Sequence, residues 1–281
     1  MILATRGSAL AMAQAELVRQ KLEAAGASVT ILPVTTKGDR DRNRPLTEIG
    51  GDGLFIRELE KVLLSGEADL AVHSGKDLPF RLAEGLVIGG VPEMGDPRDC
   101  LLRRPDAGRI IGTGSPRRQA EYRRLDPEAE FAGIRGNINT RIERLKEGKY
   151  DGIILAKAGL DRLKPDISGL TATVFFAEEM IPAPCQGILA VECRAEDRRI
   201  RELLQAVTDL QAERRFTAER YLFQRLQADC AVPVGVHAEF SGTDREELRI
   251  RVLFRGARME KCGPASGYRA LCDEICEEIC R

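Results

Sequence analysis

Residues 1–32 read MILATRGSALAMAQAELVRQKLEAAGASVTIL, and this stretch decides the fold class. Residues 2–4 predict a short strand, and Ser8 is a residue type that caps the N-terminus of a helix. Apolar positions at helical spacing follow as far as Gly26, and residues 29–32 predict a second strand. A strand, a helix and a strand in this order are typical of layered α/β proteins, whose binding sites lie at strand ends.

The same alternation continues along the chain and restarts after Arg98. The first series adds one helix and two strands, predicted at residues 53–64, 70–72 and 87–91. In the second series, strands are predicted at residues 109–112 and 152–155. One helix is predicted to begin at Ser115-Pro116 and another at about Asn137. From about Asp209 the pattern changes to a helix, alternating strands and a final helix, which predicts a small α+β region.

The composition is that of a globular protein. The chain has 281 residues, of which 43% are hydrophobic and 31% charged, and its net charge is -1. This balance argues against a general attraction to nucleic acid or to an anionic membrane. No apolar run approaches the roughly 20 residues of a membrane span, and the first residues do not form a signal peptide. We therefore expect a cytoplasmic protein that binds neither nucleic acid nor membrane.

Eight cysteines are present, and no two of them form a CxxC pair. Reduced thiols are expected in a cytoplasmic protein. Cys272, Cys276 and Cys280 recur every four residues beside apolar positions, which predicts a buried stripe on the C-terminal helix. A metal site is the alternative interpretation, although three thiols at this spacing match no common ligand pattern.

Arginines are concentrated in one part of the chain. Residues 98–144 contain eleven arginines, no lysine and seven acids, so this stretch is locally +4. Arg117 and Arg118 follow a strand that runs into a helix, Arg135 precedes the next helix, and Arg6 has the equivalent position in the first series. Arginine forms bidentate contacts with carboxylates and phosphates, so the pattern predicts a site for a ligand with several negative charges.

Two alternatives stay open for these arginines at this point. One is a solubilising surface, and the other is a nucleic-acid interface. Aromatic residues at 5% and the absence of Trp weigh against a stacking platform for bases. Neither a Walker lysine loop nor a GxGxxG motif occurs, so the usual nucleotide-binding signatures are missing.

Two further segments carry chemically useful side chains. Residues 71–79, AVHSGKDLP, deliver Ser74, Lys76 and Asp77 beyond the end of a predicted strand. Asp77 is suited to stabilise a developing cation and Lys76 to bind an anion, or the two are only a helix cap and its ion-pair partner. Cys230 lies in a turn between a helix and a strand, where its thiol is either a nucleophile or attachment point or simply buried packing. His73, on an apolar strand, is expected to be structural.

Taken together, these segments resemble the hydroxymethylbilane synthase family, also called porphobilinogen deaminases. The resemblance covers nearly the whole chain and rests on the order and spacing of short fragments. The fragments are Ala4-Thr5-Arg6-Gly7-Ser8 with Leu10-Ala11, Gly53-Leu54-Phe55 with Glu58-Leu59-Glu60, His73-Ser74 with Lys76-Asp77, Asp96-Pro97-Arg98-Asp99, Ser115 with Arg117-Arg118-Gln119, Arg135-Gly136-Asn137 with Thr140-Arg141, Ala158-Gly159-Leu160 with Arg162-Leu163, Thr217-Ala218-Glu219-Arg220, and Cys230 with Val232-Pro233.

The resemblance implies a transferase of tetrapyrrole and heme biosynthesis. Its members hold a dipyrromethane cofactor through a thioether to one cysteine, which maps onto Cys230. They add four porphobilinogen units to this primer with loss of ammonia, and water then releases linear hydroxymethylbilane. Each pyrrole ring carries an acetate and a propionate, which explains an arginine-lined site. Asp77 matches the catalytic aspartate, which stabilises the cationic azafulvene formed when ammonia leaves.

The family also implies roles for the remaining candidate residues. The residues implied to bind the cofactor are Ser74, Lys76, Thr113, Ser115, Arg117, Arg118 and Arg162, in addition to Cys230. The residues implied to bind the substrate are Arg6, Ser8, Arg135 and Arg141. No metal is expected. The segment from Arg40 to Asp52 matches the family's flexible lid.

The implied fold is α/β, with two doubly wound lobes like those of periplasmic binding proteins and a small α+β C-terminal domain. Domain 1 is expected at residues 1–92 with 187–206, domain 2 at 93–186 and domain 3 at 207–281. The family further implies a monomer that hands its product to uroporphyrinogen-III synthase. A pure binding protein is the rival interpretation, but it needs an export signal and no attachment cysteine.

Several positions depart from the family pattern. Asp52 stands where members commonly have Lys, so we assign it no binding role. Pro184-Cys185-Gln186-Gly187 replaces the usual Val-Gly-Gln-Gly, which predicts a stiffer crossing between domains. Asp229 and Ala231 replace a commoner Gly and a polar residue beside Cys230. These changes bear on rates and cofactor loading more than on the type of reaction.

Overall fold

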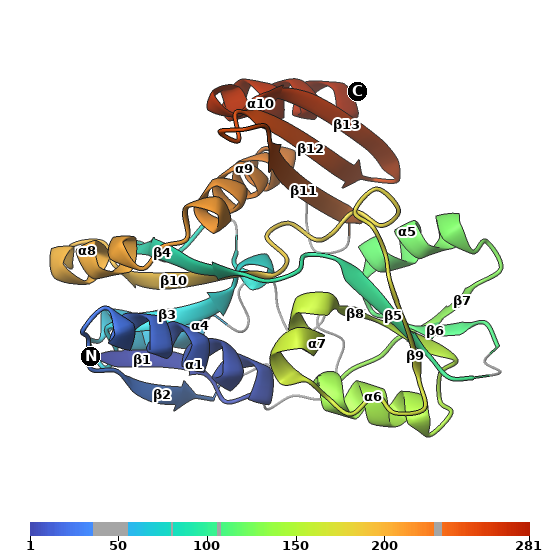
Figure 1. Cartoon of the computed structure of the whole chain (residues 1–281), viewed down its shortest axis with the longest axis horizontal. Helices are drawn as coiled ribbons and strands as arrows, with labels where there is room; N and C mark the ends of the chain where they lie inside the picture. Colours follow the sequence, from blue (N-terminus) through green and yellow to red (C-terminus); the bar gives the residue numbers. More distant parts are fainter. Residues whose placement is uncertain (36–55, 80, 106–107, 228–231) are drawn as a thin grey trace. The chain divides into compact units, whose positions relative to one another are not determined.

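The protein is described from a computed structural model, shown in Figure 1. The structure describes residues 1–35, 56–79, 81–105, 108–227 and 232–281. The chain divides into two compact units, the first formed by Met1–Gly95 with Gly187–Phe216 and the second by Asp96–Gln186 with Thr217–Arg281. The division into three domains at the boundaries given above stays a prediction.

The first unit is built on a five-stranded sheet in the order β2-β1-β3-β10-β4. The strands are β1 (Ile2–Arg6), β2 (Thr30–Val34), β3 (Leu70–Ser74), β4 (Leu86–Met94) and β10 (Ile188–Arg194). Strand β1 is parallel to β2 and β3, whereas β10 is antiparallel to β3 and β4. The parallel strands therefore direct their carboxyl ends to one edge of the sheet.

Helices cover both faces of this sheet. Helices α1 (Ala9–Ala24) and α8 (Arg198–Ala206) pack on one face through an apolar cluster that includes Val18, Leu22 and Leu204. Helix α4 (Arg57–Leu64) packs on the other face through Leu59 and Leu63. Coverage on both faces confirms the predicted doubly wound arrangement and explains why the central strands are apolar on both sides.

The second unit begins with another five-stranded sheet, in the order β7-β6-β8-β5-β9. Its elements are β5 (Asp99–Arg103), β6 (Ile110–Gly112), α5 (Pro116–Leu125), β7 (Glu130–Ala132), α6 (Ile138–Lys146), β8 (Gly152–Ala156), α7 (Lys157–Leu163) and β9 (Thr171–Val174). Strand β6 is parallel to β7 and β8, and β5 is antiparallel to β8. Ser115 caps α5 through its side-chain oxygen, as the sequence predicts, and Asn137 caps α6 in the same way at the predicted helix start.

The C-terminal part of the same unit is a three-stranded antiparallel sheet covered by helices. Its elements are α9 (Leu210–Leu226), β11 (Val234–Ser241), β12 (Glu247–Phe254), β13 (Ala257–Pro264), a 3-10 turn (Ala265–Gly267) and α10 (Tyr268–Ile279). One apolar cluster joins this sheet to α10 and to the part of α9 from Ala218 onward. The predicted α+β region is confirmed, although sequence reasoning missed the polar edge strand β13.

The predicted cysteine stripe on α10 is wrong for its last member. Cys272 is completely buried and Cys276 is partly buried, but Cys280 is exposed. The reason is that α10 ends at Ile279, so Cys280 forms the C-terminal cap beyond the packed face. Within the described residues, no helix is long and apolar enough to span a membrane.

Candidate active site

In the first unit, five predicted site residues lie at the ends of two neighbouring parallel strands or directly after them. Strand β1 aligns with β3 so that Ala4 is opposite Ala71. The carboxyl ends of both strands therefore reach the same edge of the sheet. Two of the five are at or after the end of β1, and three are at or after the end of β3. We call these residues the Asp77 cluster, which consists of Arg6, Ser8, Ser74, Lys76 and Asp77.

Local hydrogen bonds define the turn that follows each strand. Ser8 Oγ accepts from the Ala11 amide at 3.3 Å and so caps α1, while Thr5 Oγ1 donates to the Ala11 carbonyl at 3.2 Å. After β3 the chain forms a 3-10 turn, Gly75–Asp77. Gly75 is buried in this turn, and Lys76 and Asp77 are exposed. The turn thus places an ammonium and a carboxylate on two consecutive residues directly after the end of β3.

A buried pair underlies the end of β3. His73 Nε2 lies 2.9 Å from Oε2 of Glu192, and both side chains are almost completely buried. Glu192 is on β10, the antiparallel neighbour of β3. This pair joins the two strands directly before Ser74, and it supports the structural role predicted for His73.

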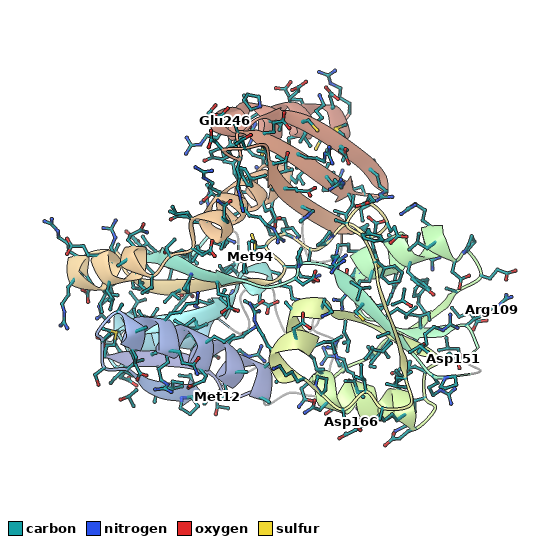
Figure 2. The ribbon with its side chains drawn as sticks, viewed as in Figure 1. Met12, Met94, Arg109, Asp151, Asp166 and Glu246 are labelled. Carbon is teal, nitrogen blue, oxygen red and sulfur yellow. The ribbon has the colours of Figure 1, made fainter. Side chains whose placement is uncertain are left out.

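In the second unit, the carboxyl ends of three parallel strands carry most of the remaining candidates. Thr113 and Ser115 follow β6, Arg135 follows β7, and Arg162 lies in α7 after β8. Ser115 Oγ accepts from the Arg118 amide at 3.4 Å, and the Ser115 amide donates to Thr113 Oγ1 at 3.2 Å. Figure 2 shows Arg109 and Asp151 at the amino ends of β6 and β8, which is the opposite edge of the sheet.

Four arginines of this region form the arginine cluster, defined as Arg117, Arg118, Arg135 and Arg141. Arg141 is tied to its own loop, because Nε donates to the Gly136 carbonyl at 2.8 Å. Burial and the charges of Arg118, Arg135 and Arg144 lower the pKa of Arg141 to about 10. These neighbouring charges disfavour the protonated form of Arg141, and a polyanionic ligand would offset them.

Asp99 is the acidic partner of two of these arginines. It is completely buried at the start of β5, opposite Ala156 at the carboxyl end of β8. Its Oδ2 lies 2.7 Å from Arg117 Nη1, and its Oδ1 accepts from Arg118 Nη2 at 2.7 Å and Nε at 3.0 Å. Burial raises the pKa of Asp99, but the charges of Arg117 and Arg118 outweigh it and hold the pKa well below its ordinary value.

The cluster keeps hydrogen-bond donors available for a ligand. Arg117 Nη1 also donates to the Ile181 carbonyl at 2.7 Å. Nη2 of Arg135 is buried and has no hydrogen-bond partner within the described part of the chain. One buried carboxylate thus faces two arginines of a cluster of four, and the excess of guanidinium groups is the donor set that a ligand rich in carboxylates requires.

Sequence reasoning missed the roles of Asp99 and Glu219, although both lie in the fragments quoted above. Glu219 is completely buried, and its two carboxylate oxygens accept from the amides of Cys185 at 2.5 Å and Ala238 at 2.9 Å. Cys185 has φ of 59°, which is the left-handed region that favours glycine. Glu219 helps to hold this conformation through the bond from the Cys185 amide.

Three predicted features lie outside the described residues. They are Cys230, Asp52 and the whole of the predicted lid segment from residue 40 to 52. The remaining twelve predicted site residues form two groups, one at a sheet edge in each unit.

The comparisons with known families bear directly on this arrangement. Residues 1–202 match the family described as porphobilinogen deaminase, dipyromethane cofactor binding domain, and residues 214–260 match porphobilinogen deaminase, C-terminal domain. The chain belongs to the porphobilinogen deaminase family. Members of this family are transferases that make hydroxymethylbilane in tetrapyrrole biosynthesis, and the matched region is the domain that binds their dipyrromethane cofactor.

Solved structures of periplasmic proteins are similar to this chain at low identity. The periplasmic VFT2 domain of Bordetella pertussis BvgS is 16% identical with a TM-score of 0.45, and 73% of this chain and 85% of that chain are covered. A periplasmic binding protein of Salmonella typhimurium with high arginine specificity is 10% identical with a TM-score of 0.43, covering 76% and 96%. A putative sulfonate-binding protein of Methylobacillus flagellatus is 13% identical with a TM-score of 0.42, covering 80% and 67%.

Proposed function

We propose that this chain is a hydroxymethylbilane synthase that holds dipyrromethane through a thioether to Cys230. It adds four porphobilinogen units with loss of ammonia and releases the linear tetrapyrrole by hydrolysis. The observation that carries the proposal is the arginine cluster, which lies at the sheet edge within the region matched to the cofactor-binding domain. We further propose that the protein acts as a monomer and hands its product to uroporphyrinogen-III synthase.

The donor set fits the cofactor. Dipyrromethane carries an acetate and a propionate on each ring, and when bound it supplies the pyrrole carbon to which the first unit is joined. Nη2 of Arg135 is a buried donor with no hydrogen-bond partner within the described residues. We assign cofactor carboxylates to Arg117 and Arg118, with Lys76 and Arg162 as further cations. Ser74, Thr113 and Ser115 add hydrogen bonds to the same ligand.

Asp77 is assigned to the chemical step. When ammonia leaves porphobilinogen, positive charge develops on the pyrrole that remains. A carboxylate fixed at the end of β3 stabilises this charge more in the transition state than in the ground state. Arg135 and Arg141 are assigned to the carboxylates of incoming substrate, because an arginine cluster with one buried acid retains net positive charge. Arg6 and Ser8 are assigned to the same carboxylates by their match to the family pattern.

The first experiment measures the intact mass of the purified protein and maps the peptide that contains Cys230. The expected result is added mass equal to two porphobilinogen-derived rings on this residue, either as purified or after incubation with porphobilinogen. Cys230→Ser removes the sulfur that forms the thioether and is expected to carry no attached pigment.

Cys262→Ser is the matched control, because Cys262 is an exposed thiol on β13. This variant is expected to load cofactor like the wild type. Normal loading of Cys230→Ser would refute the attachment site. Failure of the wild type both to acquire rings and to release ammonia would refute the proposed function and favour a binding protein.

Arg141→Ala tests the substrate assignment. One charge-assisted contact to a carboxylate is worth about 1.5–3 kcal/mol, so kcat/KM for porphobilinogen is expected to fall roughly 10- to 100-fold. Covalent enzyme species with incomplete chains should accumulate, which mass spectrometry detects directly. Arg123→Ala removes an exposed arginine of the same unit and serves as the control. Unchanged product formation in Arg141→Ala would rule out a substrate contact.

A further inference from the structure

A pair of thiols on α10 lies outside the Asp77 cluster and the arginine cluster. The Sγ atoms of Cys276 and Cys280 are 4.0 Å apart, one helical turn from each other. Cys276 is partly buried and Cys280 is exposed. Of the other cysteines within the described residues, only Cys262 is exposed, and it is on a different element.

The sulfur separation suits a bridging metal ion better than a disulfide. With metal–sulfur distances of about 2.3 Å, two thiolates are ~3.8 Å apart across a tetrahedral ion and ~4.6 Å apart across a linear one. The observed 4.0 Å lies between these values. Cβ atoms one turn apart on a helix are about 5–6 Å from each other. A disulfide needs roughly 3.5–4.5 Å, so it would require the last turn to unwind, whereas a bridging ion would not.

The charges around the pair are nearly balanced. Three of the four acids of α10 form ion pairs, Asp273 with Arg225 and both Glu274 and Glu278 with Lys261. Cys280 is the C-terminal cap of this 12-residue helix, so the pair is at its open end. The sulfur separation is therefore the feature that favours a bound ion.

The ligand set selects the class of metal. Within the described residues, no group of three or more metal-ligating side chains occurs, so the four ligands of structural zinc or of an iron–sulfur cluster are not assembled. Soft thiolates select Cu(I) among the ions that tolerate low coordination. We propose that Cys276 and Cys280 form a two-thiolate binding site for Cu(I).

Binding proceeds without a change of oxidation state. Two S–H bonds break, two Cu–S bonds form, and both protons go to solvent. The thiol of Cys276 gives up its contact with the Arg225 carbonyl, which is 3.5 Å from Sγ. The remainder of α10 keeps its packing, because Leu271, Cys272 and Ile275 hold the buried face.

The test titrates Cu(I) without oxygen into the holoenzyme against a colorimetric Cu(I) chelator of known affinity. Wild type is expected to bind one Cu(I) at this pair, and X-ray absorption should report two sulfur ligands. Cys276→Ser and Cys280→Ser should each lower the affinity at least tenfold, whereas Cys262→Ser should bind like wild type. Far-UV circular dichroism and hydroxymethylbilane formation are measured on every variant, and both should match wild type.

Wild-type affinity in Cys276→Ser, or an equal loss in Cys262→Ser, would overturn the proposal. A Cys276–Cys280 disulfide formed under Cu(I) without oxygen, seen as a loss of two mass units, would also overturn it. All variants retain Cys230, so these outcomes do not depend on the proposed function. Absence of cofactor on Cys230 would therefore be separable from absence of the copper site.

Discussion

Replacing Asp77 with Asn is expected to lower kcat for hydroxymethylbilane formation by about 10²–10³-fold. The estimate follows from the cost of removing one preorganised electrostatic group from an active site, which is about 3–4 kcal/mol. Asn has nearly the size of Asp but no charge, so it loses the stabilisation of a developing cation. Because this interaction is made chiefly in the transition state, KM should change much less than kcat.

Folding and cofactor loading should survive the Asp77→Asn change. Asp77 is exposed at the end of a 3-10 turn, so no buried charge is left without a partner. Intact mass should show the cofactor on Cys230 at the wild-type level, which separates a catalytic defect from a loading defect. Glu84→Gln, an equal change of charge at an exposed residue of the same unit, is the control. A kcat within threefold of wild type would remove the catalytic role of Asp77.

Local patterns explain why so much of the fold was predictable from the sequence. The side chains of Ser8, Ser115 and Asn137 cap their helices by accepting hydrogen bonds from the amides three residues later in the chain. The sequence pattern that marks each helix start therefore lies within one helical turn. The candidate residues follow strands whose ends share a sheet edge, and strand and helix periods are also local signals. The positions of Thr113 and Arg135 needed no knowledge of distant contacts.

The features that were missed depend on tertiary structure. Asp99 meets Arg118 only because β5 pairs antiparallel with β8, and no local pattern specifies that register. Strand β13 is an edge strand with Arg258, Glu260 and Lys261, so it lacks the apolar alternation of a half-buried strand. Cys280 is exposed because the helix ends one residue before it, and helix ends are poorly specified by periodicity.

Asp99→Asn is expected to destabilise the second unit by about 3 kcal/mol. Removing one partner of a buried ion pair costs about 3–5 kcal/mol, because the other charge stays buried without compensation. Here Arg117 and Arg118 are 4% and 8% exposed and share this one carboxylate. Asn retains one acceptor oxygen, which places the cost at the lower end of the range.

Hydrogen exchange resolved by mass spectrometry can locate this loss. Amides of α5 should lose roughly a hundredfold of protection in Asp99→Asn, whereas amides of α1, in the other unit, should be unaffected. Glu128→Gln is the matched control, because Glu128 and Arg109 form an exposed pair of the same chemistry, which is worth at most about 1 kcal/mol. Equal protection of α5 in wild type and Asp99→Asn would show that the pair contributes little.

The pH dependence of stability tests the same ion pair independently. The pKa of Asp99 is lowered in the folded protein, so its contribution is complete above the ordinary carboxyl value of about 3.9. This contribution to stability is lost as the pH falls from the ordinary carboxyl pKa through the pKa that Asp99 has in the folded protein. The difference in α5 stability between wild type and Asp99→Asn should therefore be constant from about pH 5 to 8 and should narrow below about pH 4. A difference that widens on acidification would show that Asp99 is not held ionised by Arg117 and Arg118.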